Sequence, residues 1–216
     1  MHVKETMIIF LIALAIVVTI RSVRASPDTY YLGSGDVLTT TKPRNSAIQV
    51  AIDSGETFTR TWYSNVVGGT IGEGTYTFNF YMSTGHPPGI TVHVTFKFGY
   101  YKDGTHFQIV EVSSSPVNLN QSIQSYDLSI SLTLQVNIPE GSRLYLTVTI
   151  YNPTHGNKYA YFYYGGYYSG VLCDTRIEIP SIIVPEFPAG VFTLSPMLLV
   201  PYLILRRHLP KLRSPA

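Results

Sequence analysis

The chain has 216 residues and a formal net charge of +2, from 15 Lys and Arg against 13 Asp and Glu. Seven of those basic residues lie in the two terminal segments, so residues 26–184 hold eleven acidic and eight basic side chains. A nucleic-acid surface needs clustered Lys and Arg to displace counterions from phosphate, which excludes nucleic acid as a partner. The single cysteine, Cys173, excludes an intramolecular disulfide framework.

An apolar run opens the chain, from Met7 to Ile20, without a charged residue. As a helix it would span about 21 Å, short of a hydrocarbon core of roughly 30 Å. It is therefore predicted to be the apolar part of a signal peptide, residues 1–25, with cleavage between Ala25 and Ser26. Two arginines follow the run and oppose its translocation, so an uncleaved N-terminal anchor is the alternative.

Residues 26–182 are predicted to form one domain. Short runs of β-branched and aromatic residues alternate with polar ones, and Gly, Pro, Asn and Asp turns separate them. The expected strands, about nine, are 47–52, 57–64, 74–84, 90–100, 105–113, 125–138, 143–151, 159–168 and 174–180. Residues 30–38 are expected to be a lead-in with at most a short edge strand. The pattern favours an all-β, antiparallel, jelly-roll-like β-sandwich over an immunoglobulin-like one, because the Cys…Trp…Cys pattern of antibody-type domains is absent.

Two of these expectations specify register. Asp103-Gly104 predicts a two-residue type I′ turn, since both residues tolerate positive φ, and this turn would place Tyr101 opposite His106. Residues 125–138 carry apolar side chains at alternate positions and predict the longest strand, with one buried face. A turn is expected after it, at 139–142.

No catalytic constellation is found, and the protein is not expected to be an enzyme. The chain lacks a Gly-x-Ser-x-Gly elbow, a Gly-rich phosphate loop and a His-Glu-x-x-His pair. The histidines between the terminal segments lack the spacing of metal ligands. Five loop carboxylates form no Asp-x-Asp ladder for calcium and are interpreted as solvated charges: Asp36, Asp53, Glu56, Glu73 and Asp103. No metal site or cofactor is therefore expected.

Tyrosine is in excess, with 17 in the chain and six of them within residues 159–168. Aromatic rings exposed on a sheet can stack on sugars or on a partner protein. A candidate ligand-binding surface is therefore built from Tyr163, Tyr164, Tyr167 and Tyr168. The alternative is that the tyrosines of this strand line one of its faces, as aromatic residues commonly do in β-structure.

Asn120-Gln121-Ser122 is a candidate N-glycosylation sequence. It lies in a polar loop before the longest expected strand, where an exported chain would display it. Asn120 is therefore the candidate modified residue.

The chain ends in three consecutive parts: a linker at 183–188, an uncharged apolar run at 189–205 and a basic tail at 206–216. A helix over the apolar run would be about 25 Å long, close to spanning a bilayer. Membrane helices tolerate prolines such as the two in this run when neighbouring groups satisfy the freed carbonyls. The basic residues that would hold the tail in the cytoplasm, with the sandwich outside, are Arg206, Arg207, Lys211 and Arg213.

This ending resembles the PEF-CTERM sorting signal of archaeal surface proteins. The resemblance rests on Pro185, Glu186 and Phe187, followed by the apolar run and Arg206-Arg207. It implies that an archaeosortase, a membrane transpeptidase, recognises the motif, cuts near it and transfers the protein to another anchor. Permanent anchoring without cleavage is the alternative.

The sequence thus predicts an exported, single-pass membrane protein whose β-sandwich lies outside an archaeal-type cell. The expected role is structural or adhesive within the envelope, with the membrane and a surface-layer protein or glycan as partners. The competing expectation is an extracellular carbohydrate-binding module that uses the tyrosine-rich face.

Overall fold

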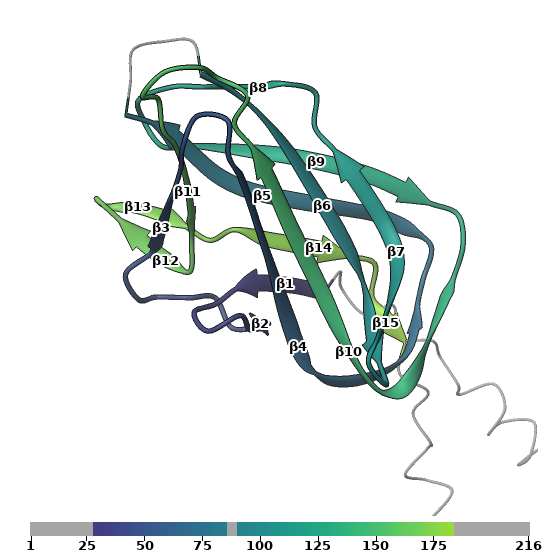
Figure 1. Ribbon diagram of the computed structural model, residues 1–216. Coiled ribbons are helices and arrows are strands. Elements are labelled where there is room, and N and C mark those ends of the chain that lie inside the picture. Colours follow the sequence, from purple (N-terminus) through teal and green to yellow (C-terminus); the bar gives the residue numbers. More distant parts are fainter. Residues whose placement is uncertain (1–27, 86–89, 184–216) are drawn as a thin grey trace, which may run out of the picture. The chain divides into compact units, whose positions relative to one another are not determined.

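A computed structural model describes residues 28–85 and 90–183, in which the chain forms fifteen β-strands and no helix (Figure 1). Within these residues, no helix is long and apolar enough to cross a membrane. The terminal features expected from the sequence lie outside the described residues: the signal peptide with its Ala25/Ser26 cleavage site, the motif at 185–187, the apolar run at 189–205 and the basic tail.

One antiparallel sheet has seven strands, and β5 (Gly74–Thr84) lies at its centre. Two strands, β14 (Arg176–Ile179) and β11 (Ala160–Tyr164), pair with successive halves of one edge of β5, and β9 (Gln124–Leu132) pairs with the opposite edge. The sheet is completed beyond β14 and β11 by β1 (Asp28–Leu32), β2 (Leu38–Thr39) and β3 (Ile48–Ile52).

The other antiparallel sheet has six strands, and its middle consists of β4 (Thr57–Ile71), β10 (Val136–Tyr151) and β6 (Ile90–Lys102). Its outer strands are β15 (Ile182–Ile183) beside β4, with β7 (Thr105–Ser113) and β8 (Val117–Leu119) both beside β6. A separate hairpin is formed by β12 (Gly166–Tyr168) and β13 (Val171–Cys173).

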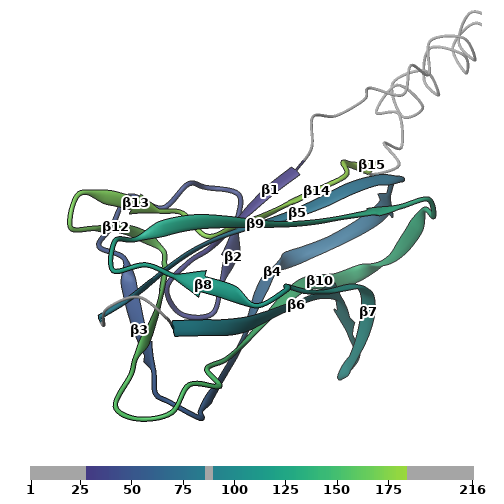
Figure 2. The ribbon, with the colours of Figure 1, turned by 90° about the horizontal axis from the view of Figure 1, so that it is seen from above.

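Aromatic side chains hold the two sheets face to face in a sandwich-like arrangement. Figure 2 shows β9, β5 and β14 in one layer and β8, β6, β10 and β7 in the other. Phe78 of β5 stacks on Phe96 of β6 with ring centroids 4.9 Å apart, and Trp62 of β4 meets Tyr164 of β11 edge-on at 5.1 Å. All four rings are fully buried. Because aromatic rings remove large apolar areas from water, this shared core is what joins the layers.

The strands β5 and β7 have the bounds expected from the sequence, and the turn between β6 and β7 is confirmed. Asp103 has a φ of 48° and Gly104 a φ of 83°, the positive values that a type I′ turn requires. The predicted pairing of Tyr101 with His106 follows from this turn and is present.

The long strand expected over 125–138 is wrong, and so is the turn expected at 139–142. The chain leaves the seven-stranded sheet after Leu132 and enters the six-stranded sheet at Val136. Leu134, in this connection, is 73% exposed. Residues 139–142 lie in an irregular part of β10, where the register against β4 shifts. The apolar alternation continues through both strands because both turn their apolar side to the same core, so it cannot reveal the change of sheet.

Residues 30–38, expected to be a lead-in with at most a short edge strand, contribute more than that to the sheet. Here β1 pairs on one side with β14 and on the other with β2, and Leu32 and Leu38 are buried in the core. The sequence did not predict these strands because the segment is rich in Gly and Asp and has few apolar residues that pack in the core. Similarly, β4 continues to Ile71, beyond its expected end at Ser64.

Candidate functional site

The tyrosine-rich segment supplies the core rather than an open surface along most of its length. In β11, Ala160, Phe162 and Tyr164 point into the sandwich and are fully buried. The Tyr164 hydroxyl accepts a hydrogen bond of 2.6 Å from Arg60, and burial raises the pKa of this tyrosine. Tyr164 therefore cannot offer a ring face to a ligand, which corrects its place in the predicted surface.

Tyr163 points to the other side of β11 but is also covered. Its ring lies 4.9 Å from that of Tyr168, its hydroxyl is 2.8 Å from the Ser83 hydroxyl, and only 3% of the residue is exposed. Of the four predicted residues, Tyr167 is the most accessible, at 50%, and Tyr168 is half-buried. Of the predicted ligand-binding surface, only Tyr167 and Tyr168 on the β12–β13 hairpin remain accessible.

A charged network occupies the face of the seven-stranded sheet beside this hairpin. The Asp174 carboxylate, 5% exposed, is held by Lys42 at 2.9 Å, by Arg176 at 3.2 Å and by the Tyr81 hydroxyl at 2.8 Å. Arg176 also binds Glu178 at 3.0 Å. Burial, reinforced by Asp174, raises the pKa of Tyr81 to about 12. Because its charges satisfy one another, this network is interpreted as structural.

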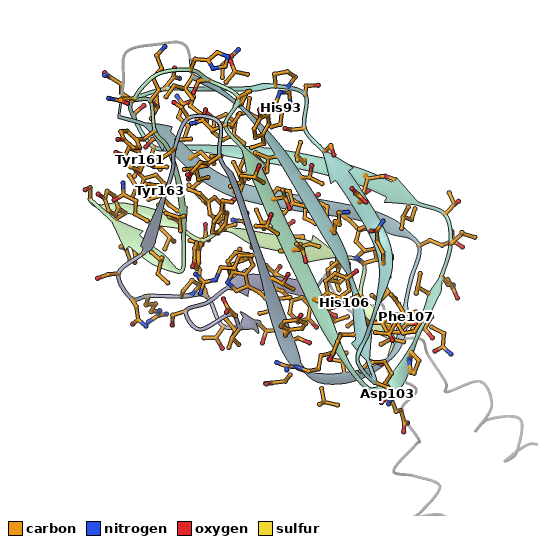
Figure 3. All side chains as sticks on the ribbon, in the orientation of Figure 1. His93, Asp103, His106, Phe107, Tyr161 and Tyr163 are labelled. Atoms are coloured by element: carbon orange, nitrogen blue, oxygen red, sulfur yellow. The ribbon has the colours of Figure 1, made fainter. Side chains whose placement is uncertain are left out.

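A second aromatic cluster, not predicted from the sequence, lies on the solvent side of the six-stranded sheet. We call it the outer aromatic patch and define it as Tyr63 of β4, Tyr101 of β6, His106 of β7, and Arg143 and Tyr145 of β10. In Figure 3, His106 lies on β7 near the Asp103 turn, at the opposite end of the sandwich from Tyr161 and Tyr163. The two aromatic groups are therefore separate.

The histidine lies at the centre of the outer aromatic patch. Its ring centroid is 4.8 Å from that of Tyr101 and 4.7 Å from that of Tyr145, with the latter ring perpendicular to it. Its Nε2 is hydrogen-bonded to the Tyr63 hydroxyl at 2.9 Å. The Arg143 guanidinium lies over the Tyr63 ring, 5.2 Å from the centroid. These contacts fix the orientation of every ring in the cluster.

The backbone is deformed beneath this cluster. The pairing of β6 with β7 shifts register between Phe98 and Gly99, and the pairing of β10 with β4 shifts between Arg143 and Tyr145. A Cβ on Gly99 would lie 2.1 Å from the carbonyl oxygen of Phe107 and 2.9 Å from the Tyr145 ring. Glycine is thus required for the bulged backbone of β7, and with it the Tyr145 ring, to lie this close to β6. Bulges that re-aim side chains are common next to binding sites.

The described residues contain no group of three or more His, Cys, Asp or Glu that could hold a metal ion. Cys173 is buried, and burial together with the neighbouring Asp174 raises the pKa of its thiol to about 11. Asn120 is exposed, and its side-chain amide donates a hydrogen bond of 2.9 Å to Gln124. Its position in a surface loop is compatible with glycosylation.

A sequence signal for the outer aromatic patch did exist. Tyr63 and Tyr101 lie at the polar positions of alternating strands, where an aromatic ring has no core to fill. Their convergence depends on strand pairing between residues far apart in the chain, which no local pattern encodes.

Comparison with known proteins identifies the fold but no family. No family model and no curated protein matches the chain. Among solved structures, a CocE/NonD family hydrolase from Staphylococcus aureus is similar with a TM-score of 0.54 and 16% identity, over 74% of this chain and 37% of that one. An aminopeptidase from a marine-sediment Thaumarchaeota archaeon has a TM-score of 0.53 and 10% identity, over 71% and 36% of the two chains.

An α-amino acid ester hydrolase is similar to the same degree, with a TM-score of 0.54 and 11% identity, over 74% of this chain and 37% of that one. The chain thus spans little more than a third of the length of each of these three proteins. At such low identity the similarity concerns the fold alone. The fold and the site together define an all-β, antiparallel two-sheet domain with an aromatic surface on its six-stranded sheet.

Proposed function

We propose that this protein is an exported, membrane-anchored cell-surface β-sandwich, jelly-roll-like in its connections, with an adhesive or structural and non-catalytic role in an archaeal-type envelope. The observation that carries the proposal is the meeting of the two ends of the described domain. The backbone amide of Ile182 donates a hydrogen bond of 3.1 Å to the carboxylate of Asp28. The first and last strands therefore begin and end side by side.

This arrangement suits a domain that is held at one place. The apolar run of the tail begins at Ala189, six residues after Ile183. Six extended residues reach about 20 Å, so an anchor in that run would keep the domain close to the bilayer. The Pro-Glu-Phe motif at 185–187 falls within this short connection, where an archaeosortase would need access to it.

The test of anchoring compares the full chain with a chain that stops after Ile183, both produced with the native front segment in an archaeal host. We expect the full chain to remain with the membrane after an alkaline carbonate wash and the shortened chain to appear in the medium. Release of the full chain by carbonate would contradict the proposal.

Intact mass of the native protein decides how it is anchored. A mass that begins at Ser26 and ends at Ala216 means a cleaved signal peptide and a retained span, whereas a C-terminus near Pro185 means sorting. In the second case, Glu186→Ala with Phe187→Ala should restore the mass of the tail. A structural role further predicts that the protein stays with the surface layer after detergent removes the lipid.

The second candidate function is that of an extracellular carbohydrate-binding module. The specific observation in its favour is that aromatic rings remain accessible at two separate places, the β12–β13 hairpin and the outer aromatic patch. An adhesive protein and a binding module differ here only in whether the glycan belongs to the same envelope.

A further inference from the structure

Aromatic rings on the solvent-facing side of a sheet do not contribute to the core between the sheets, so their clustering there calls for a functional explanation. In the outer aromatic patch, Tyr63, Tyr101 and His106 come from three different strands and retain solvent access. Flat ring faces with polar tips stack well on the apolar faces of sugars, while hydroxyl and imidazole groups bond the sugar hydroxyls. The cluster therefore has the chemistry of a sugar-binding platform.

The two basic side chains of this region, Arg143 and Lys102, are hydrogen-bonded to backbone carbonyls and not to carboxylates. The Nε of Arg143 donates a hydrogen bond of 2.8 Å to the backbone carbonyl of Ser64, and Lys102 donates one of 2.7 Å to the carbonyl of Glu140. Neither has a carboxylate within ion-pairing distance among the described residues. The terminal NH₂ groups of Arg143 are thus available to an anion.

One carboxylate close to the patch is already neutralised by a lysine. Glu111, on the same sheet, is paired with Lys97 at 3.3 Å. The contrast with the face of the seven-stranded sheet is clear, since Asp174 there is already held by two cations. A carboxylate on a ligand would supply the partner that Arg143 lacks, and Arg binds carboxylates in a two-point geometry.

We propose that the outer aromatic patch binds an acidic glycan, a polysaccharide whose sugar rings carry carboxylates. The rings of Tyr101 and His106, inclined at 53° to each other, form a twisted stacking surface. The Tyr63 hydroxyl holds His106 in place, and Arg143 pairs with the sugar carboxylate. This site goes beyond the anchoring proposal and gives its adhesive role a ligand class. It stands or falls independently of whether the tail spans a membrane.

The test measures binding of the purified full chain, in detergent micelles, to three uronate oligosaccharides by calorimetry: oligogalacturonate, alginate and hyaluronate. Neutral galactan oligosaccharide is the reference for charge, and dextran sulfate is the reference for unspecific polyanion binding. We expect at least one uronate to bind, with affinity that exceeds that for galactan and decreases with salt.

Variants locate the site. Arg143→Gln and Tyr101→Ala should each weaken uronate binding by about tenfold or more, as truncation of an interface anchor does. Arg143→Lys should recover part of the loss, because it keeps the charge but not the two-point geometry. The matched control is His93→Ala, since His93 is also exposed on the outer side of β6 and also faces an aromatic ring, that of Tyr151.

Circular dichroism and thermal unfolding establish that each variant is folded. The proposal is overturned if no uronate binds the wild-type protein, or if dextran sulfate binds as tightly as the uronates with no effect of Arg143→Gln. It is also overturned if Tyr167→Ala, at the β12–β13 hairpin, abolishes binding while Tyr101→Ala leaves it unchanged. None of these outcomes would alter the membrane fractionation, so the two proposals fail separately.

Discussion

Two buried tyrosines show how one hydroxyl group can either strengthen or weaken the core. Both Tyr76 and Tyr164 are fully buried. The Tyr164 hydroxyl accepts a hydrogen bond from Arg60, whereas the Tyr76 hydroxyl is the one buried side-chain polar atom without a partner among the described residues. Burial raises the pKa of Tyr76 to about 12. A buried polar group without a partner costs stability.

We therefore expect Tyr76→Phe to stabilise the protein by about 1 kcal/mol and Tyr164→Phe to destabilise it by a similar amount. The two substitutions remove the same atom from the same core, so each serves as the control for the other. Urea unfolding of the full chain in micelles measures both effects. A loss of stability in Tyr76→Phe would mean that its hydroxyl is satisfied.

A continuous apolar alternation in the sequence can hide a change from one sheet to the other, as it does at the connection between β9 and β10. If residues 125–138 formed one strand, Leu134 would be a core residue like its neighbours in the alternation. In the structure it is exposed, whereas Leu146, farther along β10, is fully buried. The two leucines therefore distinguish the arrangements.

Leu134→Ala should change the free energy of unfolding by less than about 0.5 kcal/mol. Leu146→Ala should cost about 2 to 5 kcal/mol, because it leaves a cavity in the core. The measurement is again the urea midpoint of the two variants against the wild-type chain. Equal and large losses of stability in the two variants would contradict this arrangement and favour a single strand over residues 125–138.

The sequence predicted those strands whose turns carry a local signal. The φ values required at Asp103 and Gly104 are a property of two residues, and both the turn and the register that it sets followed directly. Pairings such as Tyr145 with Tyr63 link residues 82 positions apart by number. No periodicity records them, which is why the buried Tyr163 and Tyr164 were predicted to bind ligand and the outer aromatic patch was not found.

At the scale of the whole molecule, stability should depend on alkaline pH. Burial raises the pKa of the Cys173 thiol from 9.0 to about 11 and those of Tyr30 and Tyr81 from 10.0 to about 12. Below its unfolded-state pKa, each group is neutral in both the folded and the unfolded protein, and its full contribution to stability is present. As pH rises, the unfolded chain loses these protons first, so stability falls between about pH 9 and pH 12.

Cys173→Ala isolates the first part of this fall. The variant should show a flatter decline in the urea midpoint between about pH 9 and 11, while the later decline that comes from the tyrosines persists. A thiol reagent should also fail to modify Cys173 at pH 8 until the protein is unfolded, because the thiolate is rare and the sulfur is buried. If the urea midpoint of Cys173→Ala declined with pH as steeply as that of the wild-type protein, the early loss of stability could not be attributed to the Cys173 thiol.

The pairing of β4 has a mechanical consequence. This strand carries Tyr63, and near its end Ile71 and Thr70 pair with Ile182 and Ile183 of β15. Tension between a glycan held at the outer aromatic patch and a tether beyond Ile183 would first load the two residue pairs that join β15 to β4. Once these pairs and the hydrogen bond from Ile182 to Asp28 have opened, the load would pass to β14 in the seven-stranded sheet. Under the proposed anchoring, β15 would therefore open before the strands that carry the outer aromatic patch are strained.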